Sequence, residues 1–316
     1  MGVNDDLISG ILNRDNRMVA RAISLIENNK AQENLLLTSL YQHTGNAYRI
    51  GITGPPGAGK SSITNGLIEL LSALGKSIAV IGVDPSSPFN HGSFLGDRVR
   101  MMNHYNKKHV FIRSMASRGS SGGLARKSQE VADIFDAAGY DYILFETVGV
   151  GQIELDVMHA TDTVIVVLVP ESGDDIQMMK AGLLEIADIF VINKSDRAGV
   201  NRIFTSLTQS LSLIDHEDNE WKSPIQKTTA TKMDGMEELV ELIKDHYKYL
   251  LKNNQMKMKS NERYCRAVKQ SIMEKSAELF WQQGNENKLK VELNKPIKHR
   301  IPPYEFAENL FDKGPQ

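Results

Sequence analysis

The chain has 316 residues, with 37 basic and 39 acidic side chains. Nucleic-acid binding usually needs an excess of basic residues, so no nucleic acid is expected as a partner. The single cysteine, Cys265, cannot form an internal disulfide, and no signal segment opens the chain, which favours the reducing cytoplasm. The longest strongly apolar run, residues 164–169, is far shorter than the roughly 20 residues that cross a bilayer, so no membrane contact is expected.

The first 46 residues contain apolar side chains at helical spacing and no β-type run. Leu7, Ile8, Ile11 and Leu12 begin this pattern, which continues to the turn at residues 45–46. It predicts an N-terminal helical extension, residues 1–46, that packs on the following domain without chemistry of its own.

A short apolar strand, residues 49–53, then runs into a glycine-rich turn. Residues 54–61 fit the pattern G-x-x-x-x-G-K-[ST], in which successive backbone N–H groups converge on a phosphate. Lys60 would bring a positive charge to the β- and γ-phosphate oxygens, and Ser61 would hold Mg²⁺. A plain strand-to-helix turn is the alternative, but an apolar helical pattern follows directly, as the motif requires. The predicted nucleotide contacts here are Gly54, Pro55, Pro56, Gly57, Ala58, Gly59, Lys60, Ser61 and Ser62.

A helix after Ser61 and a β-type run over residues 77–83 complete a strand–helix–strand unit whose strands should be parallel. The predicted fold class is therefore α/β, a mostly parallel P-loop NTPase sheet with helices on both faces and helical extensions at both ends. Asp84 ends the second strand, where ligands bind in open α/β sheets, and Asp97 lies in the polar loop that follows. Asp84 alone could also be a turn residue before proline. Together the two acids favour a switch that orders around Mg²⁺ and the γ-phosphate.

The middle of the chain alternates β-type and helical patterns. The glycine- and serine-rich stretch 114–125 interrupts them and predicts irregular structure, either a flexible linker or a loop near the nucleotide or a partner. Strands are predicted at 110–113, 142–146, 163–169 and 189–192, and helices at 126–138 and 176–186, the latter capped by Asp174 and Asp175.

The strand that begins at residue 142 ends in Glu146, which Gly149 follows three residues later. This is the D-x-x-G switch of GTPases with glutamate in place of aspartate. Glu146 can order a Mg²⁺-bound water, the Gly149 N–H can meet the γ-phosphate, and Gln152 is the nearest amide that could orient an attacking water. A loop glutamine is often only solvated, which is the alternative for Gln152. The predicted catalytic residues are Lys60, Glu146 and Gln152.

A second set of motifs concerns the base of the nucleotide. The strand at 189–192 runs into Asn193, Lys194 and Asp196, which fit N-K-x-D. An aspartate there can accept the N1–H and N2–H₂ protons of guanine, a pattern that adenine cannot supply. Thr229 and Ala230 follow another short strand, at the usual place for a backbone N–H that meets guanine O6. After a phosphate loop and an acid-x-x-G in this order, the motif indicates GTP.

A helix over 236–251 ends the predicted nucleotide domain, residues 47–251. Residues 252–260, rich in lysine, asparagine and methionine, are interpreted as a linker. A helix over 263–283 and a short helix after Pro302 would follow. Residues 252–316 are thus predicted as a C-terminal helical arm, which either folds back on its own chain or forms a dimer contact.

The motifs at 54–61, 83–87, 96–98, 146–152 and 193–196, taken in this order, resemble the methylmalonyl-CoA mutase-associated GTPases, the MeaB/ArgK family. The most specific segment is Glu-Thr-Val-Gly-Val-Gly-Gln at 146–152, and the likeness extends over nearly the whole chain. The resemblance implies a GTPase chaperone that docks on an adenosylcobalamin-dependent mutase, gates cofactor loading and protects the mutase. It also implies homodimers formed through the C-terminal arms.

By the same resemblance, Lys60 and Ser61 serve phosphate and Mg²⁺, and Asn193 with Asp196 reads guanine. The implied metal set is Ser61, Asp84, Asp97 and Glu146, and the implied partner-responsive switch contains Asp174, Asp175 and Lys180. This chain departs from the family at Ser62, His91, Ser195 and Glu171-Ser172, of which His91 and Glu171-Ser172 lie in switch loops and bear on partner identity or activation.

Two other functions are the alternatives. A nickel metallochaperone GTPase would need a Cys/His cluster, whereas this chain has one cysteine, and His104 and His109, five residues apart, have no further soft ligands beside them in the sequence. A transport-linked small-molecule kinase or ATPase would not need the guanine motif. For the GTPase, no strong internal catalyst is apparent, so we expect slow turnover that a partner accelerates.

Overall fold

The computed structural model describes residues 5–28, 30–84, 109–116, 121–149, 151–171, 182–214 and 220–312. The chain forms two compact units, residues 1–259 and residues 260–316. The predicted three-part division at residues 46 and 251 remains a prediction. Several predicted residues lie outside the described ranges, namely His91, Asp97, His104, Ser172, Asp174, Asp175 and Lys180, as does the predicted helix 176–186 up to residue 181.

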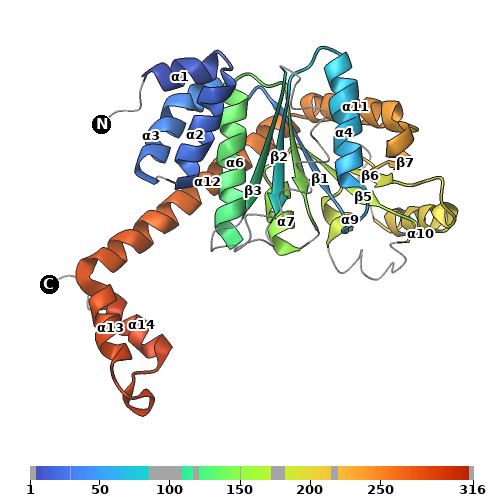
Figure 1. The fold of residues 1–316 in the computed structure, drawn as a ribbon. Helices are drawn as coiled ribbons and strands as arrows, with labels where there is room; N and C mark the ends of the chain where they lie inside the picture. The colour runs from blue at the N-terminus through green and yellow to red at the C-terminus, as the bar shows by residue number, and fades with distance from the viewer. Residues whose placement is uncertain are drawn as a thin grey trace. The chain divides into compact units, whose positions relative to one another are not determined.

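A seven-stranded parallel sheet forms the centre of the first unit, which confirms the predicted fold class. The strand order is β3-β2-β4-β1-β5-β6-β7 (Figure 1). Because β1 lies between β4 and β5, the order reverses at β1, and ligands of open α/β sheets bind at such a point. The strands are β1 (Tyr48–Thr53), β2 (Ile78–Asp84), β3 (Val110–Ala116), β4 (Tyr142–Thr147), β5 (Thr163–Leu168), β6 (Ile189–Ile192) and β7 (Ile225–Lys227).

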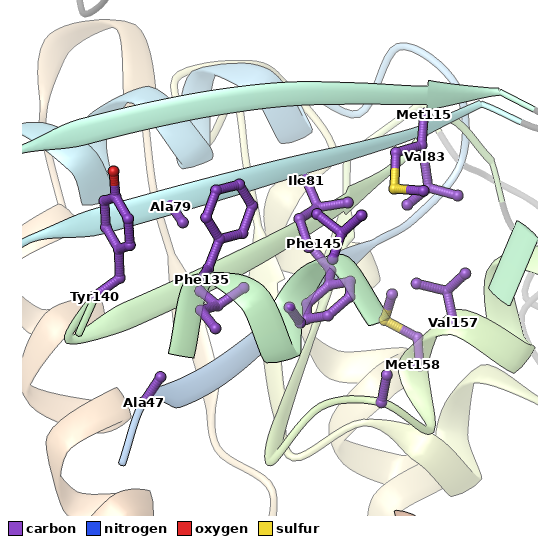
Figure 2. Packing of buried hydrophobic residues seen from close by; sticks show 14 of the residues in the cluster. Ala47, Ala79, Ile81, Val83, Met115, Phe135, Tyr140, Phe145, Val157 and Met158 are labelled. Carbon is purple, nitrogen blue, oxygen red and sulfur yellow. The ribbon is translucent and has the colours of Figure 1, made fainter. Parts of the chain in front are cut away.

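Helices cover both faces of this sheet, as predicted. Strand β2 shows why, because Ala79, Ile81 and Val83 enter one buried cluster while Ile78 and Val80 enter another. The first cluster packs against α6 (Ser121–Ala137) and α7 (Gln152–Met158), and Figure 2 shows aromatic and aliphatic side chains meeting there. The second packs against α4 (Lys60–Ala73) and α11 (Met236–Lys252), on the opposite side of the sheet (Figure 1).

The N-terminal extension is helical, as predicted, and comprises α1 (Asp5–Leu12), α2 (Asn16–Asn28), α3 (Lys30–Leu40) and the short η1 (Tyr41–His43). Several of its apolar side chains, among them Ile11, Ile23 and Leu36, are fully buried in the cluster that contains Phe135 of α6. The extension is therefore part of the core of the first unit.

Two predictions about irregular structure are wrong. In the glycine- and serine-rich stretch, β3 continues to Ala116 and α6 begins at Ser121 rather than at residue 126. Burial of Leu124 in the core outweighs the low helix propensity of the glycines. The expected linker at 252–260 is helical from Gln255, because Met256 packs on the core and the Lys259 ammonium donates to the Asp162 carbonyl at 2.7 Å.

The other helices that the structure describes in the first unit are α9 (Leu183–Ile186), α10 (Val200–Ser212) and η3 (Ala230–Lys232). Helix α12 (Gln255–Phe280) continues into the second unit, where a π-helical turn (Trp281–Asn285), α13 (Glu286–Leu293), η5 (Ile297–His299) and α14 (Pro303–Asp312) follow. The two predicted C-terminal helices are thus present. Among the described helices, none is long and apolar enough to cross a membrane.

Candidate nucleotide site

The phosphate loop connects the end of β1 to the start of α4, and its glycines adopt conformations that other residues avoid. Gly54, Gly57 and Gly59 have φ values of 148°, 78° and 89°. A Cβ on Gly54 would lie 2.1 Å from the Val167 carbonyl oxygen, and one on Gly59 would lie 2.2 Å from Asn193 Nδ2. The loop therefore requires glycine at both positions, and it leads directly into the N-terminus of α4 at Lys60.

Lys60 is buried, with 6% of its surface exposed. Its ammonium Nζ donates to the carbonyl oxygens of Gly54 at 2.7 Å and Pro55 at 2.9 Å, so the side chain folds over its own loop. A buried ammonium needs strong acceptors, and phosphate oxygens at this loop would supply them.

Three of the predicted metal ligands lie on neighbouring elements, and two of them are in contact. Ser61 on α4 donates its hydroxyl to Glu146 Oε1 at 2.5 Å, and Glu146 is buried at the end of β4. Asp84 is buried at the end of β2, which pairs with β4 so that Val83 lies opposite Thr147. Hydroxyl and carboxylate oxygens are the donors that Mg²⁺ prefers, usually one or two carboxylates with water, so these residues fit the ion. Within the described ranges no three His, Cys, Asp or Glu side chains gather as a metal cluster, and Asp97 lies outside those ranges.

Two threonines hold the turn after β4, and their only mark in the sequence is a hydroxyl at the end of each apolar strand. Thr53 Oγ1 donates to the Gly149 carbonyl at 3.1 Å, while Thr147 Oγ1 lies 3.0 Å from both Thr53 Oγ1 and the Gly149 oxygen. Both threonines are buried. This cluster fixes the peptide group of Gly149 beside the phosphate loop. Gln152 is the first residue of α7, and its catalytic role remains a prediction.

The N-K-x-D loop is joined directly to the phosphate loop. Asn193, which is 3% exposed, donates from Nδ2 to the Ala58 carbonyl at 2.9 Å, and Lys194 donates from Nζ to the Gly57 carbonyl at 2.8 Å. Lys194 has a φ of 55°, a left-handed conformation that turns the chain at this point. The residues predicted for the phosphates and for the base therefore form one connected site.

The loop at Thr229 and Ala230 completes the predicted base site from a third segment. The Ala230 N–H donates to Asn193 Oδ1 at 3.2 Å, as does the hydroxyl of Thr228, a residue that the sequence did not single out. Thr229 Oγ1 lies 3.1 Å from Ser195 Oγ. Asn193 and Ala230 are therefore in contact, and the Ala230 N–H is hydrogen-bonded to the Asn193 side chain.

Asp196 lies at the exposed end of this loop. Its Oδ2 accepts from the ammonium of Lys232 at 3.1 Å. That hydrogen bond is the largest cause of a lowered pKa for the Asp196 carboxyl. The carboxylate is 45% exposed, so it is both ionised and accessible as an acceptor for N–H donors.

Comparisons with known proteins show to which family the chain belongs. A family model described as methylmalonyl Co-A mutase-associated GTPase MeaB matches residues 19–285. The GTPase ArgK of Escherichia coli is 37% identical over 236 residues, which cover 72% of this chain and 71% of ArgK. A Pyrococcus horikoshii protein named as a candidate GTPase is 46% identical over 270 residues, or 85% of each chain.

Two further relatives extend the likeness. The mitochondrial methylmalonic aciduria type A homolog of Mus musculus is 31% identical over 272 residues, covering 81% of this chain and 66% of the mouse protein. The crystal structure of an LAO/AO transport system kinase matches with a TM-score of 0.73 at 25% identity and covers 99% of both chains. With a P-loop site of this form and a family match over most of its length, the chain belongs to the methylmalonyl-CoA mutase-associated GTPase family, MeaB, and is a GTPase.

Proposed function

We propose that this GTPase is a chaperone of an adenosylcobalamin-dependent acyl-CoA mutase, methylmalonyl-CoA mutase or a relative of it, and that it gates cofactor loading and protects the mutase. The family description names association with that mutase, and the mouse relative is named after methylmalonic aciduria. A cytoplasmic location is part of the proposal, since a chain with one cysteine has no need of an oxidising compartment.

The observation that carries the switch part of this proposal is the hydrogen bond between Ser61 and Glu146. It joins the start of the phosphate-loop helix to the end of β4, immediately before the turn at Gly149 and helix α7. Binding or losing a nucleotide at the loop changes what the Ser61 hydroxyl contacts. Glu146 then transmits that change to the segment behind it, where a partner can detect it.

The proposed hydrolysis assigns one task to each residue. Lys60 stabilises negative charge on the phosphate oxygens, the Gly149 N–H meets the γ-phosphate, and Gln152 orients the attacking water. Asn193 and Asp196 select guanine. Ser61, Asp84, Asp97 and Glu146 would hold Mg²⁺, which neutralises phosphate charge when bound. Since no strong internal catalyst is evident among these groups, turnover is slow until the partner contributes one.

A homodimer through the C-terminal arm is also part of the proposal. Helix α12 has 26 residues, and none of its side chains, all of which the structure describes, is buried. Its exposed Tyr264, Val268, Ile272 and Leu279 recur at helical spacing and form one apolar stripe. Helices are marginal in water without packing of such a face, and a second copy of the arm would cover it.

Light scattering tests the dimer. Ile272→Glu places a charge in the stripe, whereas Gln270→Glu places the same charge on the opposite side of the helix and serves as the control. We expect the first variant to be monomeric and the second to remain dimeric. A monomeric unmodified protein at micromolar concentration would contradict the dimer without affecting the GTPase assignment.

The mutase proposal is tested by adding the cobalamin-dependent mutase of the same organism to the GTPase. We expect GTP hydrolysis to accelerate and co-purification to differ between GTP and GDP, with Lys60→Ala as the inactive control. No change in either measurement would contradict the proposal. ATP that displaces GTP at equal concentration would instead support the alternative of a small-molecule kinase.

A further inference from the structure

Lys232 is an exposed residue of η3 that belongs to none of the sequence motifs and has no role in the proposed hydrolysis. Its ammonium lies 3.1 Å from Oδ2 of Asp196. We propose that Lys232 is a positioning residue for guanine recognition, which holds the Asp196 carboxylate in place to accept the base. This inference rests on the proposed role of Asp196 in reading guanine.

The backbone from which Lys232 projects is fixed by the turn around it. The Lys232 N–H donates to the Thr229 carbonyl at 2.8 Å, and the Met233 N–H donates to the Ala230 carbonyl at 3.3 Å. Met233 follows in the left-handed conformation, with a φ of 62°, and the Thr229 N–H donates to the Asp234 carbonyl at 3.0 Å. The lysine side chain therefore starts from a closed turn rather than from a free loop.

The same turn also holds the rest of the base loop. Ala230 contacts Asn193, Thr229 contacts Ser195 through their hydroxyls, and the Ser195 N–H donates to the Thr228 carbonyl at 2.9 Å. These contacts fix the backbone and the buried end of the loop. The Lys232 contact extends the same connection to the Asp196 carboxylate itself.

The carboxylate keeps enough acceptor capacity for the base. Two carboxylate oxygens offer about four lone-pair sites, so one N–H from Lys232 leaves room for the two donors of guanine. The ammonium also lowers the pKa of Asp196 and keeps it in the form that only accepts hydrogen bonds. If the Lys232 ammonium instead blocked the carboxylate, its removal would strengthen GTP binding.

The test compares Lys232→Ala with Lys227→Ala by calorimetric titration of GTP and GDP. Both variants remove one positive charge from the same segment. The Lys227 ammonium, however, donates to Asn201 Oδ1 at 3.1 Å and lies over the Phe204 ring. For an exposed ion pair we expect about two- to fivefold weaker nucleotide binding in Lys232→Ala, and no change in Lys227→Ala. Lys232→Arg should restore binding, and kcat at saturating GTP should stay unchanged.

A second readout depends on pH. Because Lys232 lowers the pKa of Asp196, GTP affinity should fall at a higher pH in Lys232→Ala than in the unmodified protein when the solution is acidified. In the Asp196→Ala background, Lys232→Ala should cause no further loss, because the group on which it acts is gone.

Tighter GTP binding by Lys232→Ala, or equal losses in Lys232→Ala and Lys227→Ala, would overturn the proposal. If Asp196→Ala weakens GTP binding and Lys232→Ala does not, only the role of Lys232 is refuted. If Asp196→Ala itself leaves GTP affinity unchanged, the guanine assignment fails as well, so the two failures are distinguishable.

Discussion

Gly59→Ala should damage guanine recognition although Gly59 belongs to the phosphate loop. Gly59 has φ and ψ of 89° and 27°, a left-handed conformation that alanine adopts only with strain. The added Cβ would lie 2.2 Å from Asn193 Nδ2, closer than any real contact. The Asn193 side chain must therefore move, and its hydrogen bonds to Ala58 and Ala230 must break or lengthen.

The size of the effect follows from two terms. The left-handed conformation costs alanine about 1–2 kcal/mol. Displacing Asn193, which is 3% exposed, leaves buried polar groups unsatisfied at about 1–3 kcal/mol. We expect the free energy of unfolding without nucleotide to fall by about 2–5 kcal/mol in total.

Gly57→Ala is the matched control. Gly57 has a φ of 78°, and among the described residues nothing lies within 4 Å of an added Cβ, so this variant loses only the conformational term. Urea unfolding without nucleotide measures the stability of both variants, and the ratio of GTP to ATP affinity measures base discrimination. Equal stability losses in the two variants, together with unchanged discrimination in Gly59→Ala, would refute the displacement of Asn193.

Three further predictions concern single side chains. Arg49→Met removes a buried guanidinium that lies 2.8 Å and 3.1 Å from two carboxylates of α6, and should lower the free energy of unfolding by about 3–5 kcal/mol; a loss near zero would show that this pair is solvated. Burial raises the pKa of Glu130 to about 7, so the native state binds the extra proton and stability should fall as pH rises from about 4.5 to 7. Glu130→Gln should lose this slope in unfolding measured against pH, and an unchanged slope would assign the titration to another group. Lys60→Ala should retain the native circular dichroism spectrum but lose GTP binding, and unaltered affinity would refute the phosphate-loop assignment.

The fold followed from the sequence where local pattern and tertiary packing agree. The strand–helix–strand unit ending at Asp84 has short connections, which favour parallel strands, and β1 and β2 both pair in parallel with β4. The pattern failed where packing outweighed composition. The first turn of α6 is glycine-rich and yet helical, because Leu124 is buried in the core. Residues near Met256 resemble a linker and yet form the first turn of α12, because Met256 is partly buried against the core.

For the site, the chemistry of each motif could be predicted from the residues alone, because a phosphate loop or an N-K-x-D loop is contiguous and its spacing is visible in one segment. How these segments join depends on the tertiary fold. Asn193 reaches Ala58, Thr53 reaches Gly149, and Lys232 reaches Asp196. Each contact joins residues 36 or more positions apart. Such contacts depend on the strand order and on which side chains meet at the carboxyl edge of the sheet, and local spacing in the sequence shows neither.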